Sequence, residues 1–514
     1  MSKKKDKDIT GRSRMARNLV GRWLGQIVVV VSGFVIPRMI DVNLGAVALG
    51  IWDFGWSTVS YFRYMGFGLA AGLNRFVAMY NAKEDVTNLR RCVSSTVFLQ
   101  IFIASCVVLA SFGVAALVPI LFDEIEPAQV VDSQLVLIFL GCNLAVRMAF
   151  WPSRGILTGY HLWTVTAGVT AFGDIVMLVG MFAALKMGGT LAHLGMIVFG
   201  TAVITETIRV TMAKRVYPHP MISWKSVDRA TMKEMIIFGI KNSIGGMSRL
   251  IVLQTTALCL AASAGPAALA VYARPVALFS HADKFISLYA FLLTPVAGSL
   301  QGLNRETELR ELLLSSLQAS FAMTIPAIVM LSGYGDAVIR LWMGEDYVVL
   351  ALAPILGLAF LLPYAHAVAM RILVGVNAHG RVAVRSLMYS AIVLAICITV
   401  AFNIGWTPTV AAVVVCISMM AGPGISVVAG ACKRFGVGFG DYLRGAVARP
   451  LLCNLPLIAI VLTSRVIDRD VTALDAAIWS AVGGSIVLVL YWFFIMPDSL
   501  RDKFRRRLGI RVSA

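Results

Sequence analysis

Charged side chains interrupt several of the longest apolar stretches of this sequence. Residues 44–75 are apolar enough to cross a membrane, yet they include Asp53 and Arg63. A charge at the centre of a membrane-spanning helix costs roughly 2.5–3.5 kcal/mol on insertion scales, so such groups normally face a bundle interior or a water-filled cavity. We therefore expect this helix to line a polar cavity.

A second apolar stretch, residues 266–300, carries a basic stripe. Arg274, His281 and Lys284 stand at positions i, i+7 and i+10, so they share one helix face over about 15 Å. A positive wall of this kind attracts anions, and guanidinium groups bind phosphate oxygens in a bidentate manner. The predicted ligand is a phosphate or diphosphate. The cations predicted to bind it are Arg22, Arg63, Lys241, Arg249, Arg274 and Lys284.

These charges also have structural interpretations. Basic side chains near the ends of spans, including Arg22, Lys241 and Lys284, could extend to the membrane interface. Acidic residues within spans could bind a coupling proton or cation, or neutralise a neighbouring arginine. A histidine could carry a proton or simply be hydrogen-bonded within the bundle. The candidate coupling residues are Asp53, Asp174, Glu206, His281 and Asp283, and the arginines interpreted as topology determinants are Arg147, Arg154 and Arg371.

The composition defines the class of protein that must position these groups. Hydrophobic residues make up 59% of the 514 residues, charged residues 14%, and the mean hydropathy is +0.82. Runs of about 20 apolar residues, the length that a spanning helix needs, recur along the chain and exclude a porin-type barrel. The sequence therefore predicts an all-α polytopic membrane protein.

The net charge of +18 has a topological explanation. Basic residues concentrate in the two tails and in alternate loops, as the retention of lysine and arginine on the cytoplasmic side predicts, so we expect no nucleic-acid partner. The eight cysteines form no CxxC pair and fall almost entirely in apolar runs, where they act as packing residues.

Hydropathy and the distribution of lysine and arginine predict about fourteen spans with both termini in the cytoplasm. Residues 44–52 resemble 264–272, and residues 156–161 resemble 372–377 at nearly the same separation. This repeat predicts two pseudo-symmetric lobes of six helices in the same orientation, followed by two C-terminal helices. The predicted segments are a basic tail (1–16), an N-terminal lobe (17–216), a cytoplasmic linker (217–232), a C-terminal lobe (233–433), two extra helices (445–497) and a basic tail (498–514).

The sequence contains no enzyme signature. It has no Walker loop, no metal-ligand spacing and no nucleophile paired with a base. The predicted external loops are short, which leaves no place for a large external catalytic domain. We therefore expect transport without ATP and without a cofactor, with coupling to H⁺ or Na⁺ as an option.

Two segments carry a family resemblance. The segment LGAVALGIWDFGWSTVSYFRYMGFGLAAGLNRFVAMY (44–80) resembles the second-span region of bacterial polysaccharide flippases. These are the O-antigen and exopolysaccharide branch of the multidrug, oligosaccharidyl-lipid and polysaccharide exporter superfamily. The segment AVIRLWMGEDY (337–347) resembles the one these proteins carry between spans nine and ten. With the final pair of spans, the predicted total departs from the usual twelve spans of these proteins. In the number of spans, the chain resembles the lipid II flippase branch.

The resemblance implies a two-lobed carrier that alternates between inward-open and outward-open states. Its implied substrate is an undecaprenyl-diphosphate-linked oligosaccharide, moved between leaflets of the bacterial inner membrane with coupling to an ion gradient. The implied partners are the lipid bilayer and glycan polymerase machinery. We hypothesise that Arg63, Arg249 and Arg274 engage the diphosphate. The alternatives are a lipid II-type flippase, a multidrug antiporter with an acidic cavity, and, from another class, a membrane glycan polymerase or ligase.

Overall fold

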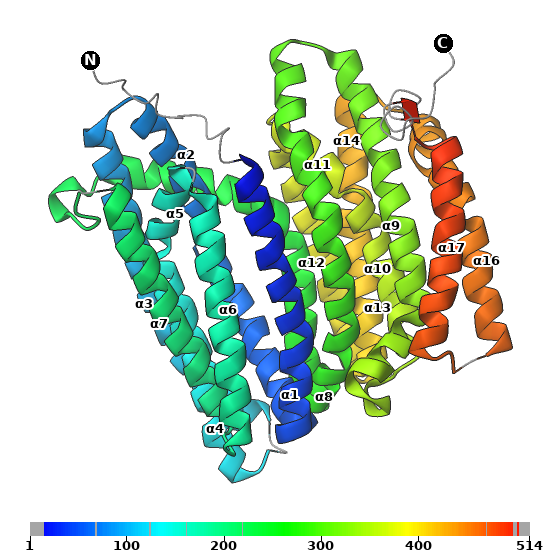
Figure 1. Cartoon of the computed structure of the whole chain (residues 1–514), viewed down its shortest axis with the longest axis horizontal. Helices are drawn as coiled ribbons and strands as arrows, with labels where there is room; N and C mark the ends of the chain where they lie inside the picture. The colour runs from blue at the N-terminus through cyan, green and yellow to red at the C-terminus, as the bar shows by residue number, and fades with distance from the viewer. Residues whose placement is uncertain are drawn as a thin grey trace. The chain divides into compact units, whose positions relative to one another are not determined.

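The structure is a computed structural model that describes residues 15–66, 69–122, 125–160, 162–217, 219–468, 470–496 and 501–502. Over these residues it is helical, with short connecting turns and no β-strand (Figure 1). By internal contacts the chain divides into two compact units. One comprises Met1–Ser243 and Ala264–Leu269, and the other comprises Ile244–Ser263 and Ala270–Ala514.

The helices follow one another in a simple order. The first half contains α1 (Met15–Tyr64), α2 (Leu69–Ala82), α3 (Val86–Leu121), α4 (Pro127–Ala149), α5 (Trp151–Gly159), α6 (Trp163–Lys186), α7 (Leu191–Val216) and the short 3₁₀ turn η2 (Trp224–Ser226). The long helix α8 (Arg229–Gly302) contributes to both units. The second half contains α9 (Glu306–Met343), η3 (Glu345–Tyr347), α10 (Leu352–Ala365), α11 (Ala367–Gly375), α12 (His379–Ile404), α13 (Pro408–Met419), η4 (Met420–Ser426), α14 (Val427–Phe435), α15 (Phe439–Tyr442), η5 (Leu443–Ala448), α16 (Arg449–Ile467) and α17 (Ala473–Phe494).

Twelve helical segments of the described chain are long and apolar enough to cross a membrane. Two of them, Val28–Tyr64 and Ser243–Gly302, contain a glycine with a non-helical backbone. Gly45 has φ 84° and ψ 172°, and Gly265 has φ 82° and ψ 165°, a conformation that glycine adopts without steric cost. Each of these two segments therefore consists of two limbs, one on each side of its glycine. Counted as separate limbs, the twelve segments correspond to the fourteen predicted spans. The predicted all-α membrane fold is confirmed.

The same backbone irregularities recur in both halves of the chain. Besides the two glycines, Glu84 (φ 56°) precedes α3 and Asn304 (φ 55°) precedes α9. The nine-residue helices α5 and α11 each follow a helix break and each end in glycine. These features are the structural counterpart of the two pairs of similar sequence segments.

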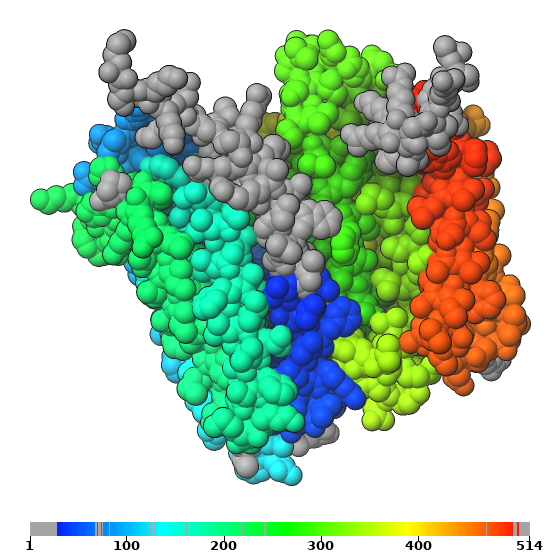
Figure 2. All heavy atoms as spheres, viewed as in Figure 1, coloured from blue at the N-terminus to red at the C-terminus, as the bar shows by residue number. Residues whose placement is uncertain are grey.

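The C-terminal pair α16 and α17 packs on α9 within the second unit. Arg465 of α16 forms an ion pair with Asp336 and donates a hydrogen bond of 2.7 Å to the carbonyl of Gly333. The hydroxyls of Tyr334 and Ser464 lie 2.7 Å apart. Figure 2 shows α17 on the outer surface of this unit, and its exposed side chains are largely apolar, as on a lipid-facing helix. The π-helical turn η5 directly precedes α16.

The turn at Gly265 packs against α1 within the first unit, and this contact requires a glycine. A Cβ added at Gly50 would lie 1.8 Å from the carbonyl oxygen of Pro266. Because that atom belongs to the backbone, we expect Gly50→Ala to lower the free energy of unfolding by about 1–3 kcal/mol, measured by denaturation of the purified protein. The control is Gly200→Ala on α7, where an added Cβ meets no atom within 4 Å. Equal stability of the two variants would contradict the contact.

A carboxylate of α4 caps the N-terminus of α7. Asp132 accepts hydrogen bonds from the backbone N–H groups of Leu191 (2.9 Å) and Ala192 (3.1 Å) and from the hydroxyl of Thr190 (2.5 Å). We expect Asp132→Ala to cost about 1–2 kcal/mol of stability, since capping groups contribute this much. Asp132→Asn keeps one acceptor oxygen and should lose less. Unfolding curves of both variants test this, and an unchanged Asp132→Ala variant would refute the capping role.

Candidate functional site

An ion pair joins the two limbs of α8 in the second unit. Arg249 Nη1 lies 2.5 Å from Asp283 Oδ2. By the helical rise of 1.5 Å per residue, the two residues lie about 24 and 27 Å along their limbs from the turn at Gly265, so the returning chain brings them level. The Arg249 guanidinium also lies over the ring of Tyr364, 5.3 Å from its centroid, and near that of Phe360. The carboxylate of Asp283 therefore holds the edge of the Arg249 guanidinium, and the aromatic rings contact its face.

Two further cations act on the same carboxylate. Lys284 and Arg371 both interact electrostatically with Asp283. Arg371 is exposed in the middle of the short helix α11, and its guanidinium lies 5.4 Å from the ring centroid of Phe291. We call Arg249, Asp283, Lys284 and Arg371 the basic cluster. Three cations surround one carboxylate, which leaves an excess of two positive charges.

The predicted basic stripe of α8 divides into two environments. At one end, Lys284 Nζ lies 3.4 Å from His281 Nδ1, so His281 adjoins the basic cluster. At the other end, Arg274 is only 2% exposed. Its Nε donates to the carbonyl of Ala270, and its guanidinium lies 5.7 Å from the ring centroid of Trp342. The structure therefore joins Lys284 and His281 to the site and packs Arg274 in the core.

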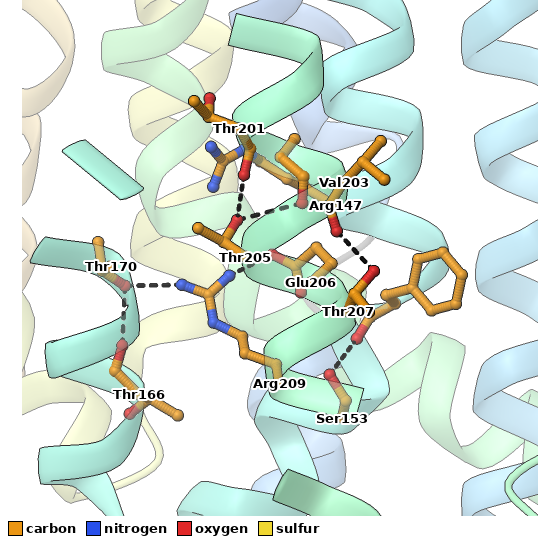
Figure 3. Close-up of polar contacts among 12 residues, drawn as sticks. Arg147, Ser153, Thr166, Thr170, Thr201, Val203, Thr205, Glu206, Thr207 and Arg209 are labelled. Atoms are coloured by element: carbon orange, nitrogen blue, oxygen red, sulfur yellow. Dashed lines mark hydrogen bonds and ion pairs between the residues drawn. The ribbon is translucent and has the colours of Figure 1, made fainter. Parts of the chain in front are cut away.

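A different cluster of charges lies inside the first unit. Arg209 on α7 is 2% exposed and forms an ion pair with Glu206, which is 4% exposed (Figure 3). Arg209 Nη2 also donates to Thr170 Oγ1 of α6 at 2.8 Å. Arg147 on α4 and Asp174 on α6 interact electrostatically with this pair. We call Arg147, Asp174, Glu206 and Arg209 the buried charge cluster; its two cations balance its two carboxylates, and Arg154 of α5 also interacts electrostatically with Glu206.

A cavity of about 240 Å³ adjoins the buried charge cluster within the first unit. It lies between the two limbs of α1 and α6, and among the described residues Asp174 is the only charged one that lines it. Trp52 and Trp56, one helical turn apart on α1, meet edge to face at its wall with ring centroids 6.0 Å apart. The remaining lining residues are Val29, Ser32, Gly33, Ile36, Pro37 and Met177.

The other predicted residues lie apart from these groups. Arg63 is exposed in the last turn of the first-unit helix α1 and makes no hydrogen bond or ion pair within the described part of the chain. Asp53 is half-buried on the same helix. The side chains of Arg22 and Lys241 lie outside the described residues, so their roles stay predictions.

Three arginines of these clusters have roles that the sequence did not predict. Arg209 follows Glu206 at the i+3 spacing typical of helical ion pairs, a signal that was present in the sequence. The sequence indicates topology determinants at Arg147 and Arg371, whereas the structure places Arg147 in the buried charge cluster. Only the fold shows that Arg371 interacts electrostatically with Asp283.

Comparisons with known proteins now define the family. Residues 53–352 match the model of a family described as polysaccharide biosynthesis protein. The chain belongs to this family. The predicted resemblance is thus confirmed at the level of the family. No curated protein sequence matches the chain.

Solved structures of other proteins share the fold of this chain. The lipid II flippase MurJ, in an inward closed conformation, aligns over 96% of this chain and 100% of its own with a TM-score of 0.68 and 12% identity. An inward-facing multidrug resistance MATE family transporter of the MOP superfamily aligns over 80% of this chain and 94% of its own, with a TM-score of 0.65 and 13% identity. A MOP superfamily transporter from Pyrococcus furiosus, for which a binding pocket of reverse polarity suggests a different function, also aligns. The alignment covers 80% of this chain and 96% of the transporter, with a TM-score of 0.54 and 13% identity.

Proposed function

We propose that this protein is a flippase that translocates an undecaprenyl-diphosphate-linked oligosaccharide across the bacterial inner membrane by alternating access. The family and the multi-pass fold support transport of a lipid-linked glycan. The protein binds and releases its substrate without breaking a covalent bond. In this proposal both termini lie in the cytoplasm, and the substrate enters from the cytoplasmic leaflet.

The basic cluster is the observation that carries this proposal. A diphosphate that links two organic groups bears two negative charges, which match the excess of two positive charges around Asp283. Arginine and lysine side chains bind phosphate oxygens through charge-assisted hydrogen bonds. Arg249, Lys284 and Arg371 are therefore the proposed diphosphate ligands. Of the other arginines predicted for this role, Arg63 has a free guanidinium within the described chain, whereas Arg274 already has packing partners.

The positive excess also separates this function from its nearest rival. An organic cation would be repelled by a site with three cations and one carboxylate, so the basic cluster does not suit the substrate of a cation antiporter. Coupling to H⁺ or Na⁺ stays a prediction. Among its candidates, Glu206 and Asp283 are engaged in ion pairs, and Asp174 lines the first-unit cavity.

The direct genetic test is deletion of the gene followed by analysis of the lipid-linked oligosaccharides on each leaflet. We expect the lipid-linked oligosaccharide to accumulate on the cytoplasmic leaflet and the wild-type gene to reverse this. An unchanged lipid-linked pool together with altered sensitivity to cationic drugs would instead favour the antiporter. Loss of polymerised glycan with normal translocation would favour the polymerase.

A further inference from the structure

The first-unit cavity has the size of a site for one small ring. Its volume of about 240 Å³ falls below the roughly 300–1,000 Å³ of sites for drug-sized ligands. It is also several times the roughly 30 Å³ that one water molecule occupies in the liquid. The described part of its wall is mostly apolar, and apart from the indole N–H groups its polar side chains are Ser32 and Asp174. An apolar pocket with few polar groups is the usual composition of a small-molecule site.

Both polar side chains have unused hydrogen-bonding capacity. Ser32 is 6% exposed, and its Oγ makes no hydrogen bond to any described group of the chain. Asp174 Oδ2 is likewise buried and accepts no hydrogen bond from the described residues. Since buried polar atoms in folded proteins nearly always have a partner, a ligand that donates hydrogen bonds would complete this wall.

The charge balance selects a neutral ligand. Arg147 and Arg209 interact electrostatically with Asp174, and Glu206 interacts with the same two arginines and with Arg154, so both carboxylates are already compensated by cations of the chain. No negative charge therefore remains to compensate an organic cation. An anion would face the lone pairs of Asp174, which as a carboxylate only accepts hydrogen bonds. A neutral molecule with hydroxyl groups satisfies both constraints.

Trp56 supplies the complementary apolar surface. Its side chain is 36% exposed, whereas Trp52 behind it is 5% exposed and fixes it edge to face. An indole ring offers a large rigid face at low cost in conformational entropy. A pyranose ring has an apolar face of C–H groups and a rim of hydroxyls, so it presents the two surfaces that this cavity requires.

We propose that this cavity is a subsite for one neutral sugar ring of the transported glycan, stacked on Trp56 and hydrogen-bonded to Asp174 and Ser32. The proposal rests on the proposed function, because the sugar belongs to the lipid-linked oligosaccharide. It separates the roles of the two units: the basic cluster binds the diphosphate, and the cavity recognises a sugar.

The test is binding of free sugars to the purified full-length protein in neutral-lipid nanodiscs, followed by saturation-transfer difference NMR. The probes are methyl glucoside, methyl galactoside and N-acetylglucosamine, with methyl glucuronide as the anionic counterpart and tetraphenylphosphonium as the cationic one. We expect at least one neutral probe to bind, with the strongest transfer to its ring C–H protons. We expect neither charged probe to compete for the cavity.

Matched variants assign the binding to the cavity. We expect Trp56→Ala and Asp174→Leu each to weaken neutral-sugar binding by about tenfold. Trp56→Phe keeps an aromatic face and Asp174→Asn keeps an acceptor oxygen, so both should retain most of it. Trp224→Ala removes a 73% exposed indole outside the cavity and should leave binding unchanged. Melting curves of each variant show that the protein is folded.

Three results of the binding experiment would overturn the subsite. They are no binding by any neutral sugar, binding unchanged in folded Trp56→Ala and Asp174→Leu proteins, and binding of tetraphenylphosphonium that disappears in Asp174→Asn. The deletion experiment tests the flippase function separately. The lipid-linked glycan could accumulate on deletion, and the Trp56→Ala variant could restore translocation fully. This pair of results would refute the subsite and support the flippase function. An unchanged lipid-linked pool would refute the flippase, and the proposed role in glycan recognition with it.

Discussion

Replacing Glu206 with leucine is expected to lower the free energy of unfolding by about 3–5 kcal/mol, because it removes one partner of a buried ion pair. Arg209 would then be buried with a single hydrogen bond to the neutral hydroxyl of Thr170. The buried charge cluster would also carry one uncompensated positive charge. Reversible unfolding in detergent, together with the protein level in cells, measures the effect.

The control for this prediction is the double variant Glu206→Leu/Arg209→Leu. It removes both charges, and apolar replacements of a buried ion pair are often neutral or stabilising. We therefore expect the second substitution to recover most of the stability that the first one lost. A double variant that is clearly less stable than Glu206→Leu would show that the two substitutions act independently. The two side chains would then not be coupled as the structure indicates.

Substitution of Arg371 should have the largest effect on substrate binding. The residue is exposed and its guanidinium contacts the ring of Phe291, so Arg371→Ala removes a proposed phosphate ligand with little loss of packing. A charged hydrogen bond is worth about 1.5–3 kcal/mol, and we expect affinity for the lipid-linked substrate to fall roughly 10- to 150-fold. Equilibrium binding of a lipid diphosphate to the purified protein in nanodiscs measures this.

Two variants test whether the Arg371 guanidinium binds phosphate oxygens in a bidentate manner. Arg371→Lys keeps the charge but loses bidentate geometry, so its affinity should be intermediate. Arg305→Ala removes an exposed arginine that pairs with Glu308 outside the basic cluster, and it should bind like the wild type. A loss in Arg305→Ala equal to that in Arg371→Ala would show that only the total charge matters.

Hydropathy and lysine and arginine placement predicted the fold because each span is a local property of the sequence. The lipid environment requires helices, and a helix of sufficient length is visible in about 20 residues. The turn residues Gly45 and Gly265 also lie in the segments that the repeat identified. Such features depend on neighbours in sequence, so a single chain is enough to find them.

Which residues belong to each site depends on tertiary structure. Helical periodicity placed Arg274 on one face with Lys284, yet Trp342 of α9 covers Arg274. Arg249 and Asp283 are 34 residues apart, and their pairing follows from the reversal of the chain at Gly265. Counting residues from that glycine would have predicted the pair. The approach of Arg371 to Asp283 depends on how α11 packs, which no periodicity in the sequence encodes.

Transport of a diphosphate-linked lipid, and its recognition by the basic cluster, can be tested together in proteoliposomes. Purified protein is reconstituted with a labelled polyprenyl-diphosphate oligosaccharide. A membrane-impermeant reagent then measures how much of the label reaches the opposite leaflet. We predict translocation by the wild type and by Arg305→Ala, and almost none by Arg249→Ala/Arg371→Ala. Equal translocation by the double variant, or none by the wild-type protein, would contradict the account.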